Sequence, residues 1–589
     1  MASDLLTTSG INNLVNNFKV AESNKKINPL TTKKTYYQNL DTAYSTLSSR
    51  LNSLKSLLSE LKLSGVSSIF SSKKASSSNT NFVNVTAANS AVNGASSLRI
   101  NQLAKNDIVM SQDLSSTANS TVITTAGTYN FVITAGDGSG GTFTSTVSAT
   151  FDASDFTAGA ISNQKVMEKL SGAINSDKAT VLSNSVTGST LSSGSFTLNL
   201  NGTSTQINYS AGTYSAVMDS IVTQINSLSG ITAEKIVNGS NYQLKITVTD
   251  SSKYLTISGD TGTLVNELNI AATKEKGASG IVSATVFSPA ASYSQLSITA
   301  KETGNDYRIL SLSDSVGSQA LTSVGLNLGG TRQTFVQNAG TDTPGYVYST
   351  TALNSKIEFN GINIERNSNV ISDLLTGATI TLKSLMQPTD STVTLSISND
   401  ESKVKEKIQD FVTKFNDVYN FIKEKSTSNK DGRGIFVGDS SASSLLSILG
   451  TTAYSTVTGI PQNEINTLSK LGITFSSTSG LSISNSSQLD SALADKINQV
   501  EALFNSTSGI ANYLYDRVNP YLGVDGYITK AKTNFSSSIT SLSDSITSMQ
   551  SRIDKNAESL RNRYIKLQTQ LAQLLSNQSY FSFGSGFFS

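Results

Sequence analysis

Two short segments contain residue types at spacings that could perform chemistry. Gly438-Asp439-Ser440 places a hydroxyl beside a carboxylate, as in some serine hydrolases, and residues 136–141 read Gly-Asp-Gly-Ser-Gly-Gly, as in a phosphate-binding loop. A serine nucleophile needs a neighbouring base, and a phosphate-binding loop of this kind continues into Lys-Ser or Lys-Thr. The chain has no His, and neither pair follows Gly141. We therefore predict no catalytic residue, and we interpret residues 136–141 as a hairpin turn.

The amino-acid composition argues against most other kinds of site. The 589 residues include no Cys, His or Trp, so the chain offers no thiolate or imidazole ligand for zinc and no Cys-His nucleophile. Only an all-carboxylate site is left open, and we predict no enzymatic activity, no metal and no cofactor. The net charge is +2, with 15% charged residues, whereas binding to nucleic acid needs clustered Lys and Arg. Nucleic acid is therefore not an expected partner.

Two cellular locations are consistent with the composition. Residues 1–25 lack the continuous apolar core of a secretory signal peptide, and no stretch approaches the roughly 20 apolar residues that span a bilayer. These features are typical of a cytosolic protein. However, the absence of Cys and the count of only six Pro would also suit a chain exported unfolded, since no disulfide could block passage and few X-Pro bonds would slow refolding.

Both ends of the chain carry sustained apolar repeats at coiled-coil spacing. Near the start the repeat consists of Tyr37, Leu40, Tyr44, Leu47, Leu51, Leu54, Leu58 and Leu61. Near the end, Ile539, Ile546, Ile553, Leu560, Leu567 and Leu574 recur every seven residues. A helix with one narrow apolar stripe gains most of its stability by burying that stripe against a partner. We predict that each stripe packs against the other end of the chain or against a neighbouring subunit.

The second position of the C-terminal repeat changes from apolar to polar along the helix. Leu542 and Met549 fill it first, and Asn556, Arg563 and Gln570 fill it afterwards. Ala557, Tyr564 and Leu571 then supply apolar side chains one residue later. The seam therefore rotates along the helix, which argues against one fixed two-stranded coil.

A shorter amphipathic helix is predicted before the first repeat. Ile11, Leu14, Val15 and Phe18 have helical spacing, and Asn28-Pro29 interrupts the helix. Because such a short helix has little of its own chain to pack on, we expect these side chains to contact another protein chain.

The middle of the chain, from Phe82 to about Asn399, has the alternation of β-strands. Residues 129–133, 196–200 and 242–248 alternate in polarity and lie next to glycines. The pattern from Val166 to Ser176 recurs from Val217 to Ser227, each time after strands, which indicates a duplicated module of strands and one short helix. The predicted fold class is α+β and multidomain, with a helical, coiled-coil-like part formed by both chain ends and β-rich domains from the middle.

Short motifs occur in a characteristic order towards both ends. They include Ser9-Gly10-Ile11, Pro29-Leu30, Gly94-Ala95-Ser96-Ser97-Leu98-Arg99-Ile100, Phe359-Asn360-Gly361-Ile362, Ile364-Glu365-Arg366-Asn367, Gly377-Ala378-Thr379-Ile380, Leu471-Gly472-Ile473 and Gly480-Leu481-Ser482-Ile483. In this order they resemble the flagellar filament-capping proteins, the FliD or hook-associated protein 2 family. The duplicated module is similar to the insertion motif of flagellins and hook-associated proteins, whereas residues 111–190 and 329–351 match no motif of the family.

The resemblance implies a structural cap at the distal tip of the bacterial flagellar filament, secreted through the flagellar type III export apparatus. Such a protein would form a homo-oligomeric ring, most often a pentamer, and promote the folding and insertion of exported flagellin. The implied partners are flagellin, the filament end, hook-associated proteins, and an export chaperone that binds the C-terminal helix. Neither nucleic acid nor a membrane is implied.

With the resemblance, the pattern divides the chain into a leg and a head. Residues 1–35 and 536–589 are expected to form terminal leg helices that contact the filament, 36–70 and 400–535 the helical leg body, 71–106 and 280–399 a β-rich head domain, 107–187 an outer head domain, and 188–279 a second outer module of the flagellin-insertion type. The residues expected to contact the filament or another subunit are Ile11, Leu14, Val15, Phe18, Ile553, Leu560, Leu567, Leu571 and Leu574. Those expected to pack inside the leg are Leu40, Tyr44, Leu47, Leu51, Leu54 and Leu58.

Two other functions are consistent with the same features. A hook-filament junction protein or a flagellin-like axial protein would share the terminal repeats and the insertion module. A tip adhesin that binds host glycans or mucin would use the β-rich middle, although no motif marks a glycan site.

Overall fold

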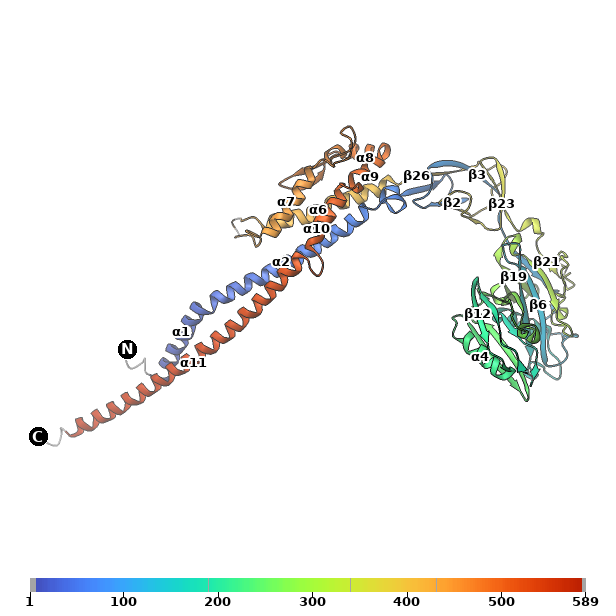
Figure 1. Ribbon diagram of the computed structural model, residues 1–589, viewed down its shortest axis with the longest axis horizontal. Helices are drawn as coiled ribbons and strands as arrows, with labels where there is room; N and C mark the ends of the chain where they lie inside the picture. The colour runs from blue at the N-terminus through green and yellow to red at the C-terminus, as the bar shows by residue number, and fades with distance from the viewer. Residues whose placement is uncertain (1–6, 189, 339, 429, 431, 585–589) are drawn as a thin grey trace. The chain divides into compact units, whose positions relative to one another are not determined.

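The computed structural model describes residues 7–584, apart from residues 189, 339, 429 and 431, and these form two compact units. Residues 7–74, 88–90 and 399–584 make up the first, here called the helical unit. Residues 75–87 and 91–398 make up the second, the β-rich unit. The predicted α+β class, with helices from both ends and a β-rich middle, is confirmed (Figure 1). Of the predicted terminal leg helices, residues 1–6 and 585–589 lie outside the described residues.

The helical unit contains eight described helices and one hairpin. They are α1 (Thr8–Lys26), α2 (Asn28–Leu61), α6 (Glu401–Lys425), α7 (Ser440–Tyr454), α8 (Ser486–Asp495), α9 (Ile497–Asn505), α10 (Ile510–Val518), α11 (Tyr527–Gly584), and the strands β27 (Ile473–Ser476) and β28 (Gly480–Ile483). The N-terminal apolar repeat lies on α2, which begins at Asn28. Pro29 fits in its first turn, where a backbone N–H has no acceptor within the helix.

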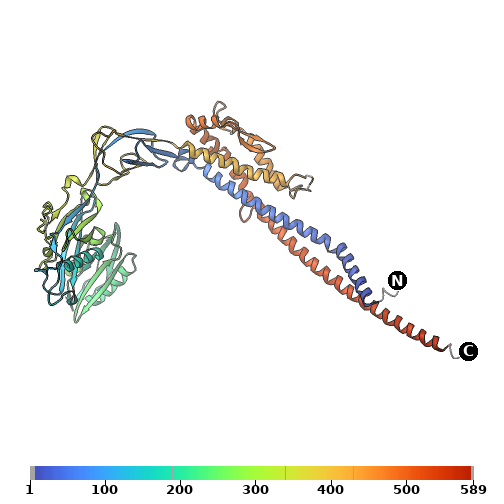
Figure 2. The same cartoon turned by 180° about the vertical axis from the view of Figure 1, so that it is seen from behind.

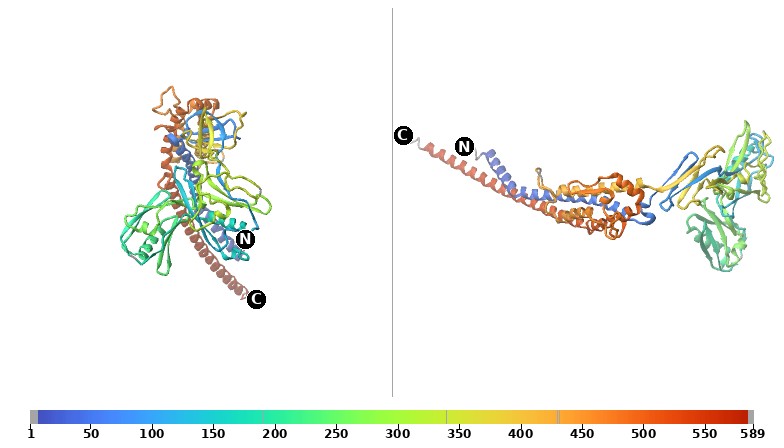
Figure 3. Two further views of the ribbon diagram at one scale, coloured as in Figure 1. Left: turned by 90° about the vertical axis from the view of Figure 1, so that its right-hand side faces the viewer. Right: turned by 90° about the horizontal axis from the view of Figure 1, so that it is seen from above.

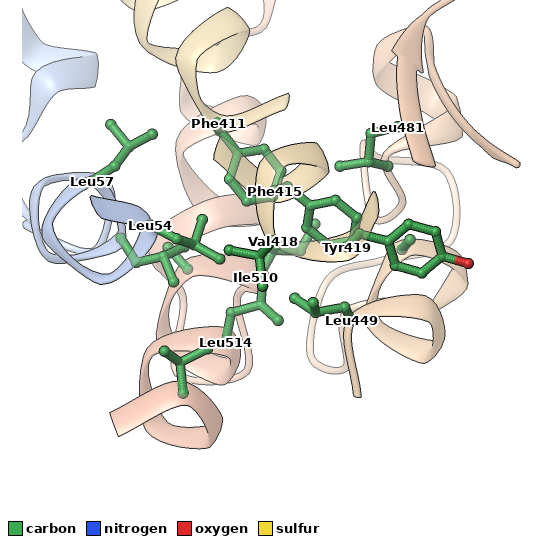
Figure 4. Packing of buried hydrophobic residues seen from close by; sticks show 14 of the residues in the cluster. Leu54, Leu57, Phe411, Phe415, Val418, Tyr419, Leu449, Leu481, Ile510 and Leu514 are labelled. Carbon is green, nitrogen blue, oxygen red and sulfur yellow. The ribbon is translucent and has the colours of Figure 1, made fainter. Parts of the chain in front are cut away.

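The core of the helical unit forms where α2, α6, α7 and α10 meet, and Figure 4 shows how its side chains converge. Leu54 of α2 is fully buried, as are Phe411 of α6, Leu449 of α7 and Leu514 of α10. Such large apolar groups gain roughly 1.5–3 kcal/mol each when they leave water. The aromatic rings of Phe411 and Phe504 meet edge to face at 5.5 Å. Because α2 and α11 also lie side by side, residues from both chain ends share this unit (Figure 2).

Among its described residues the β-rich unit has three large cores, and the first is built from antiparallel sheets. One sheet has the order β1-β26-β3-β22-β23, with bounds Lys73–Ser77, Val393–Asn399, Gly94–Gln102, Ser355–Phe359 and Ile362–Arg366. The other has the order β2-β25-β24, with bounds Val83–Ala87, Ala378–Leu382 and Val370–Ile371. Val83 and Val85 of β2 point to the same face and are buried, as the period of a strand requires.

The second core belongs to residues 106–176 and 278–346, here called the host module. Its elements are β4 (Asn106–Met110), β5 (Leu114–Ser115), β6 (Gly127–Gly136), β7 (Thr142–Phe151), α3 (Asn163–Ser176), β18 (Val282–Phe287), β19 (Tyr293–Thr303), β20 (Ile309–Asp314) and β21 (Gly345–Tyr346). Residues 278–346 share this core with residues 109–174. The long-range pairing of β19 with β4 brings the two segments together, and it leaves no local trace in the sequence.

The third core belongs to residues 179–272, here called the insert module, because the chain enters and leaves it within the host module. Its elements are β8 (Thr180–Leu182), β9 (Val186–Thr187), β10 (Thr190–Leu191), β11 (Gly194–Leu200), β12 (Thr203–Tyr209), β13 (Gly212–Thr213), α4 (Tyr214–Asn226), β14 (Ile231–Asn238), β15 (Asn241–Val248), β16 (Tyr254–Ser258) and α5 (Leu264–Leu268). The recurring pattern falls on α3 and α4, and each helix buries its apolar face against strands, as predicted.

One sheet runs through both modules. Its order is β12-β11-β16-β17-β7-β6-β20, where β17 is Ala272–Lys276. β17 pairs antiparallel with β16 of the insert module and parallel with β7 of the host module. The limits predicted for the individual domains stay predictions.

Candidate interaction surface on the terminal helices

The two terminal helices, α1 and α11, pack on each other through one small apolar cluster. Ile11 and Val15 of α1 are 2% and 7% exposed, and they enclose Ala557 of α11, which is fully buried. Phe18 and Tyr564 are partly buried beside them. A residue as small as alanine lets the helix axes approach, so this cluster fixes where along α11 the shorter helix docks.

An ion pair lies next to this apolar cluster. The Lys19 ammonium is 2.8 Å from a carboxylate oxygen of Asp554. The hydrogen bond from Lys19, with a second from Gln550, lowers the pKa of Asp554 below its ordinary value. Because both charged groups are solvated, the pair adds little to stability, and its main effect is to fix the position of α1 along α11.

The predicted contact residues of α1, and Ile553 of α11, are therefore largely covered within the chain. Ile11, Val15 and Ile553 are buried, and Leu14 and Phe18 are half-buried. Whether they also meet another chain stays a prediction.

The distal part of α11 is different, because it continues beyond the N-terminal end of α1 (Figures 1 and 3). Leu560 and Leu571 are half-buried, while Leu567 and Leu574 are 48% and 64% exposed. Leu575 is 63% exposed on the same helix. Leu567, Leu571, Leu574 and Leu575, here called the distal stripe, form an apolar strip of the width that a partner helix or groove covers.

The polar residues of the C-terminal repeat face solvent in the helical unit. Asn556, Arg563 and Gln570 are exposed, whereas Ala557 and Tyr564, one residue later, face α1. The rotation of the seam seen in the sequence thus selects which face of α11 receives α1.

The residues predicted to pack within the leg all lie in the core of the helical unit. They are Leu40, Tyr44, Leu47, Leu51, Leu54 and Leu58, each 6% exposed or less. The Tyr44 hydroxyl donates a 2.5 Å hydrogen bond to Asp439, and Phe436 and Phe535 meet its ring edge to face. Burial, reinforced by the Asp439 carboxylate, raises the pKa of Tyr44 well above its ordinary range.

Both segments whose residue types could perform chemistry have structural roles. The Asp439 side chain caps α7 by accepting a hydrogen bond from the Ala442 N–H at 2.9 Å, while it also holds Tyr44. Residues 136–141 form the turn between β6 and β7, as predicted. In that turn Asp137 accepts hydrogen bonds from the backbone of Ser139 and Gly141 and from Lys274, and the Lys274 bond is the main reason that the pKa of Asp137 is lowered.

Neither a metal centre nor a membrane span emerges from the described residues. Within residues 7–584 and outside the four gaps, no group of three or more Asp, Glu, His or Cys side chains could hold a metal ion. None of the described helices is both long enough and apolar enough to cross a membrane.

Sequence reasoning missed three long-range polar contacts. They are Tyr44 with Asp439, Lys274 with Asp137, and Arg332 with the buried carboxylate of Asp107. The partners are separated by more than a hundred residues in each case, as between 107 and 332. No local pattern could have signalled these pairs, because each depends on strands or helices that meet only in the folded chain.

Comparison with known proteins gives matches at both ends of the chain. The family description "Flagellar hook-associated protein 2 N-terminus" matches residues 9–107, and "Flagellar hook-associated protein 2 C-terminus" matches residues 352–576. The chain is 25% identical over 365 residues to the A-type flagellar hook-associated protein 2 of Pseudomonas aeruginosa, covering 60% of this chain and 74% of that protein. It is 29% identical over 241 residues to flagellar hook-associated protein 2 of Salmonella typhimurium, covering 39% of this chain and half of that protein.

Among solved structures, the D1-D2-D3 domains of the flagellar cap protein FliD from Escherichia coli are similar to this chain. The sequence identity is 20% and the TM-score is 0.46, with 84% of this chain and 99% of that chain covered.

Proposed function

Because the chain belongs to the flagellar hook-associated protein 2 family, we propose that it is a structural cap at the distal tip of the bacterial flagellar filament. In this position it promotes the folding and insertion of exported flagellin. The family is a structural one, and the two segments of this chain whose residue types could perform chemistry serve as a helix cap and a turn.

The observation that carries this proposal is that the family matches include almost all of the helical unit. The matched residues 9–107 and 352–576 contain nearly all of α1, the whole of α2 and α6 to α10, and most of α11, together with strands of the first core of the β-rich unit. The same unit bears the distal stripe, an exposed apolar strip at the end of a helix. An axial protein that docks on a helical filament needs such a surface, because helical stripes recognise one another by burying apolar side chains.

The proposed assembly is a homo-oligomeric ring, most simply a pentamer, that contacts the filament end, flagellin and hook-associated proteins. The distal stripe supports this proposal, because an apolar strip left in water favours association. Before export, a chaperone would cover the same part of α11. Mass photometry of the purified full chain tests the ring: a single species at five times the monomer mass is expected, and a monomer at all concentrations would contradict it.

Immunogold electron microscopy of intact flagella tests the function directly. Antibody raised against the full chain should place gold only at distal filament tips. Gold at the hook junction would favour a junction protein, and gold along the shaft would favour a flagellin-like axial protein. Cells that lack the gene should release flagellin into the medium instead of forming filaments.

A further inference from the structure

The insert module is joined to the host module by only two passages of the chain. The first follows α3 and contains Asp177, and the second is β17, which contains Glu275. The passages touch: a Cβ on Gly277 would lie 2.6 Å from Cα of Lys178 and 2.7 Å from the carbonyl oxygen of Asp177. No real side chain tolerates such contacts, so the two passages pack backbone to backbone at this joint.

Asp177 and Glu275, one carboxyl group from each passage, line the same cavity at the joint. The cavity has a volume of about 700 Å³ and is bordered by both modules, including Thr146 of β7 and Thr247 of β15. Asp177 holds the passages together, because it accepts hydrogen bonds from the Ser145 hydroxyl at 2.5 Å and from the Ala278 N–H at 2.6 Å. The joint therefore has its own polar centre, separate from the apolar cores on either side.

Glu275 has weaker support at this centre than Asp177. Its carboxylate accepts one hydrogen bond from the Thr146 N–H, at 3.3 Å. Burial, together with the negative charge of Asp177, raises the pKa of Glu275 to about 7, although the hydrogen bond from Thr146 opposes that change. Burial also raises the pKa of Asp177, although hydrogen bonds from Ser145 and Ala278 oppose that change.

The cations around Glu275 are engaged elsewhere or turned to solvent. Lys274, on β17 itself, pairs with Asp137 of the β6–β7 turn. Lys245 of β15 pairs with Glu234 of β14 at 2.8 Å, and Lys178 at the rim of the cavity is exposed. The last neighbouring cation is Lys276, also on β17, whose ammonium lies 4.6 Å from the ring centre of Phe143. Burial lowers the pKa of Lys276, and the charged groups near it are Asp250, Lys301 and Glu302. In the part of the chain that the structure describes, no ion pair includes Glu275.

We propose that this joint is a proton-operated hinge. When Glu275 is protonated, the two passages stay packed on β7. When Glu275 is ionised, β17 is released and the insert module turns relative to the host module. Ionisation places a second negative charge beside Asp177 in a partly buried cavity with no cation of its own. Opening the joint hydrates that charge, which removes both the repulsion and the cost of burial.

The direction of the pH effect follows from proton linkage. In the open joint Glu275 is hydrated and has an ordinary pKa of about 4.3, whereas in the closed joint it binds its proton more tightly. Opening then releases one proton, so the closed form is favoured at low pH and is lost as pH rises towards 7. The ratio of open to closed joints should grow by up to about tenfold per pH unit within that window.

Distance measurements between nitroxide labels test the hinge in the full chain. The chain has no Cys, so Val237→Cys in the insert module and Val316→Cys in the host module would carry the only labels. Both positions are exposed, at 56% and 108%. Double electron–electron resonance should give one narrow distance distribution at pH 5.5 and a broad or second distribution at pH 8.5. Identical distributions at the two pH values would overturn the proposal.

Three variants separate the hinge from general loosening. Glu275→Gln keeps the size of the side chain without its charge, so the distance distribution of this variant should remain narrow at both pH values. A distribution that still changes with pH in this variant would also refute the hinge. Gly277→Ala should broaden the distribution at both pH values, because the methyl group forces the passages apart. Asp219→Asn, the matched control at an exposed carboxylate of the insert module, should respond to pH like the parent chain.

Asp177→Asn gives an independent readout if Glu275→Gln folds poorly, as judged by circular dichroism. Removing the neighbouring negative charge lets the closed joint tolerate ionised Glu275, so the transition should become smaller or move to higher pH. A transition of unchanged size and midpoint, or one that moves to lower pH, would contradict the coupling of the two carboxyl groups.

Discussion

Single polar contacts hold the ends of distant elements in both units. In the helical unit, the Asp439 carboxylate serves α7 as its cap and α2 as the acceptor for Tyr44. In the host module, the Asp107 carboxylate is fully buried, accepts hydrogen bonds from two Arg332 nitrogens at 2.6 and 2.9 Å, and accepts a third from the Ile309 N–H. These groups carry no chemistry, yet each joins segments that the sequence keeps far apart.

Removal of the Tyr44 hydroxyl should weaken the helical unit. We expect Tyr44→Phe to lower the free energy of unfolding by about 1 kcal/mol at pH 7, because one partly buried hydrogen bond is lost. Burial raises the pKa of Tyr44, so the native state resists ionisation and the parent chain should lose stability as pH rises above ~10, the ordinary value of an unfolded tyrosine. Tyr44→Phe should lose less over that range. Urea unfolding followed by circular dichroism measures both effects, and Tyr36→Phe, at a 47% exposed site on the same helix, is the control.

Neutralising Asp107 should be more damaging. Asp107→Asn leaves the Arg332 guanidinium, stacked at 4.1 Å from the Tyr346 ring centre, without its counter-charge. Breaking a buried pair in this way costs about 3 kcal/mol or more. Thermal unfolding should show a clear drop in the transition of the β-rich unit. Asp373→Asn breaks the solvated pair with Arg366, and it should cost less than about 1 kcal/mol; equal effects at the two sites would argue against the account given for Asp107.

At the scale of elements, α11 has two parts with different neighbours. Up to Tyr564 it packs first on α2 and then on α1, and beyond that point its apolar side chains are largely exposed. This division predicts that changes in the two parts have different consequences, one for the fold of the helical unit and the other for assembly.

Polar substitutions in α1 should detach that helix from α11. In the double variant Ile11→Ser and Val15→Ser, two buried side chains no longer contribute apolar area at Ala557, and each change costs roughly 1.5–3 kcal/mol of docking energy. Proteases should then cut residues 8–26 faster, while the far-UV spectrum of the remaining helices stays almost unchanged. Val20→Ser, at a 59% exposed site on α1, should leave the cleavage rate as it was.

Polar substitutions in the distal stripe should spare stability and impair assembly. Leu567→Ser, Leu571→Ser and Leu574→Ser together remove apolar area that is partly exposed in the single chain, so the unfolding transition should move little. If the stripe docks on the filament end, flagella should be short or absent in cells that carry this variant. The matched triple variant at Asn562, Arg563 and Gln570, each to Ser, changes exposed polar positions of the same helix and should grow filaments of normal length.

At the scale of the whole molecule, the chain is nested. The helical unit contains both described ends, the β-rich unit is inserted into it, and the insert module is inserted into the host module. The family matches end at residue 107 and resume at residue 352, so they leave out the host and insert modules. Nested insertions at surface joints tend to leave the parent domain intact.

The insert module should therefore be dispensable for folding of the rest. A deletion of residues 178–277, closed by a Gly-Gly link between Asp177 and Ala278, joins positions whose side chain and backbone already hydrogen-bond at 2.6 Å. We expect circular dichroism of the shortened chain to show a loss of only the helix content of α4 and α5, and we expect the chain to restore motility to cells that lack the gene. A larger loss of helix content would mean that the insert module supports the helical unit, contrary to the separate cores.

Periodicity in the sequence determined the helices of both ends, the strands of the middle, and the recurrence of one strand and helix pattern on α3 and α4. These features were predictable because residues three, four or two apart reveal which face of an element leaves water. The family could also be recognised from short motifs in order. Only the tertiary structure decided which segments become neighbours: that Ala557 and not Asn556 faces α1, that residues 278–346 share a core with 109–174, and that Asp177 and Glu275 line one cavity. Such contacts depend on how twisted sheets and crossing helices pack over long separations, and a stripe on one element does not specify which other element will cover it.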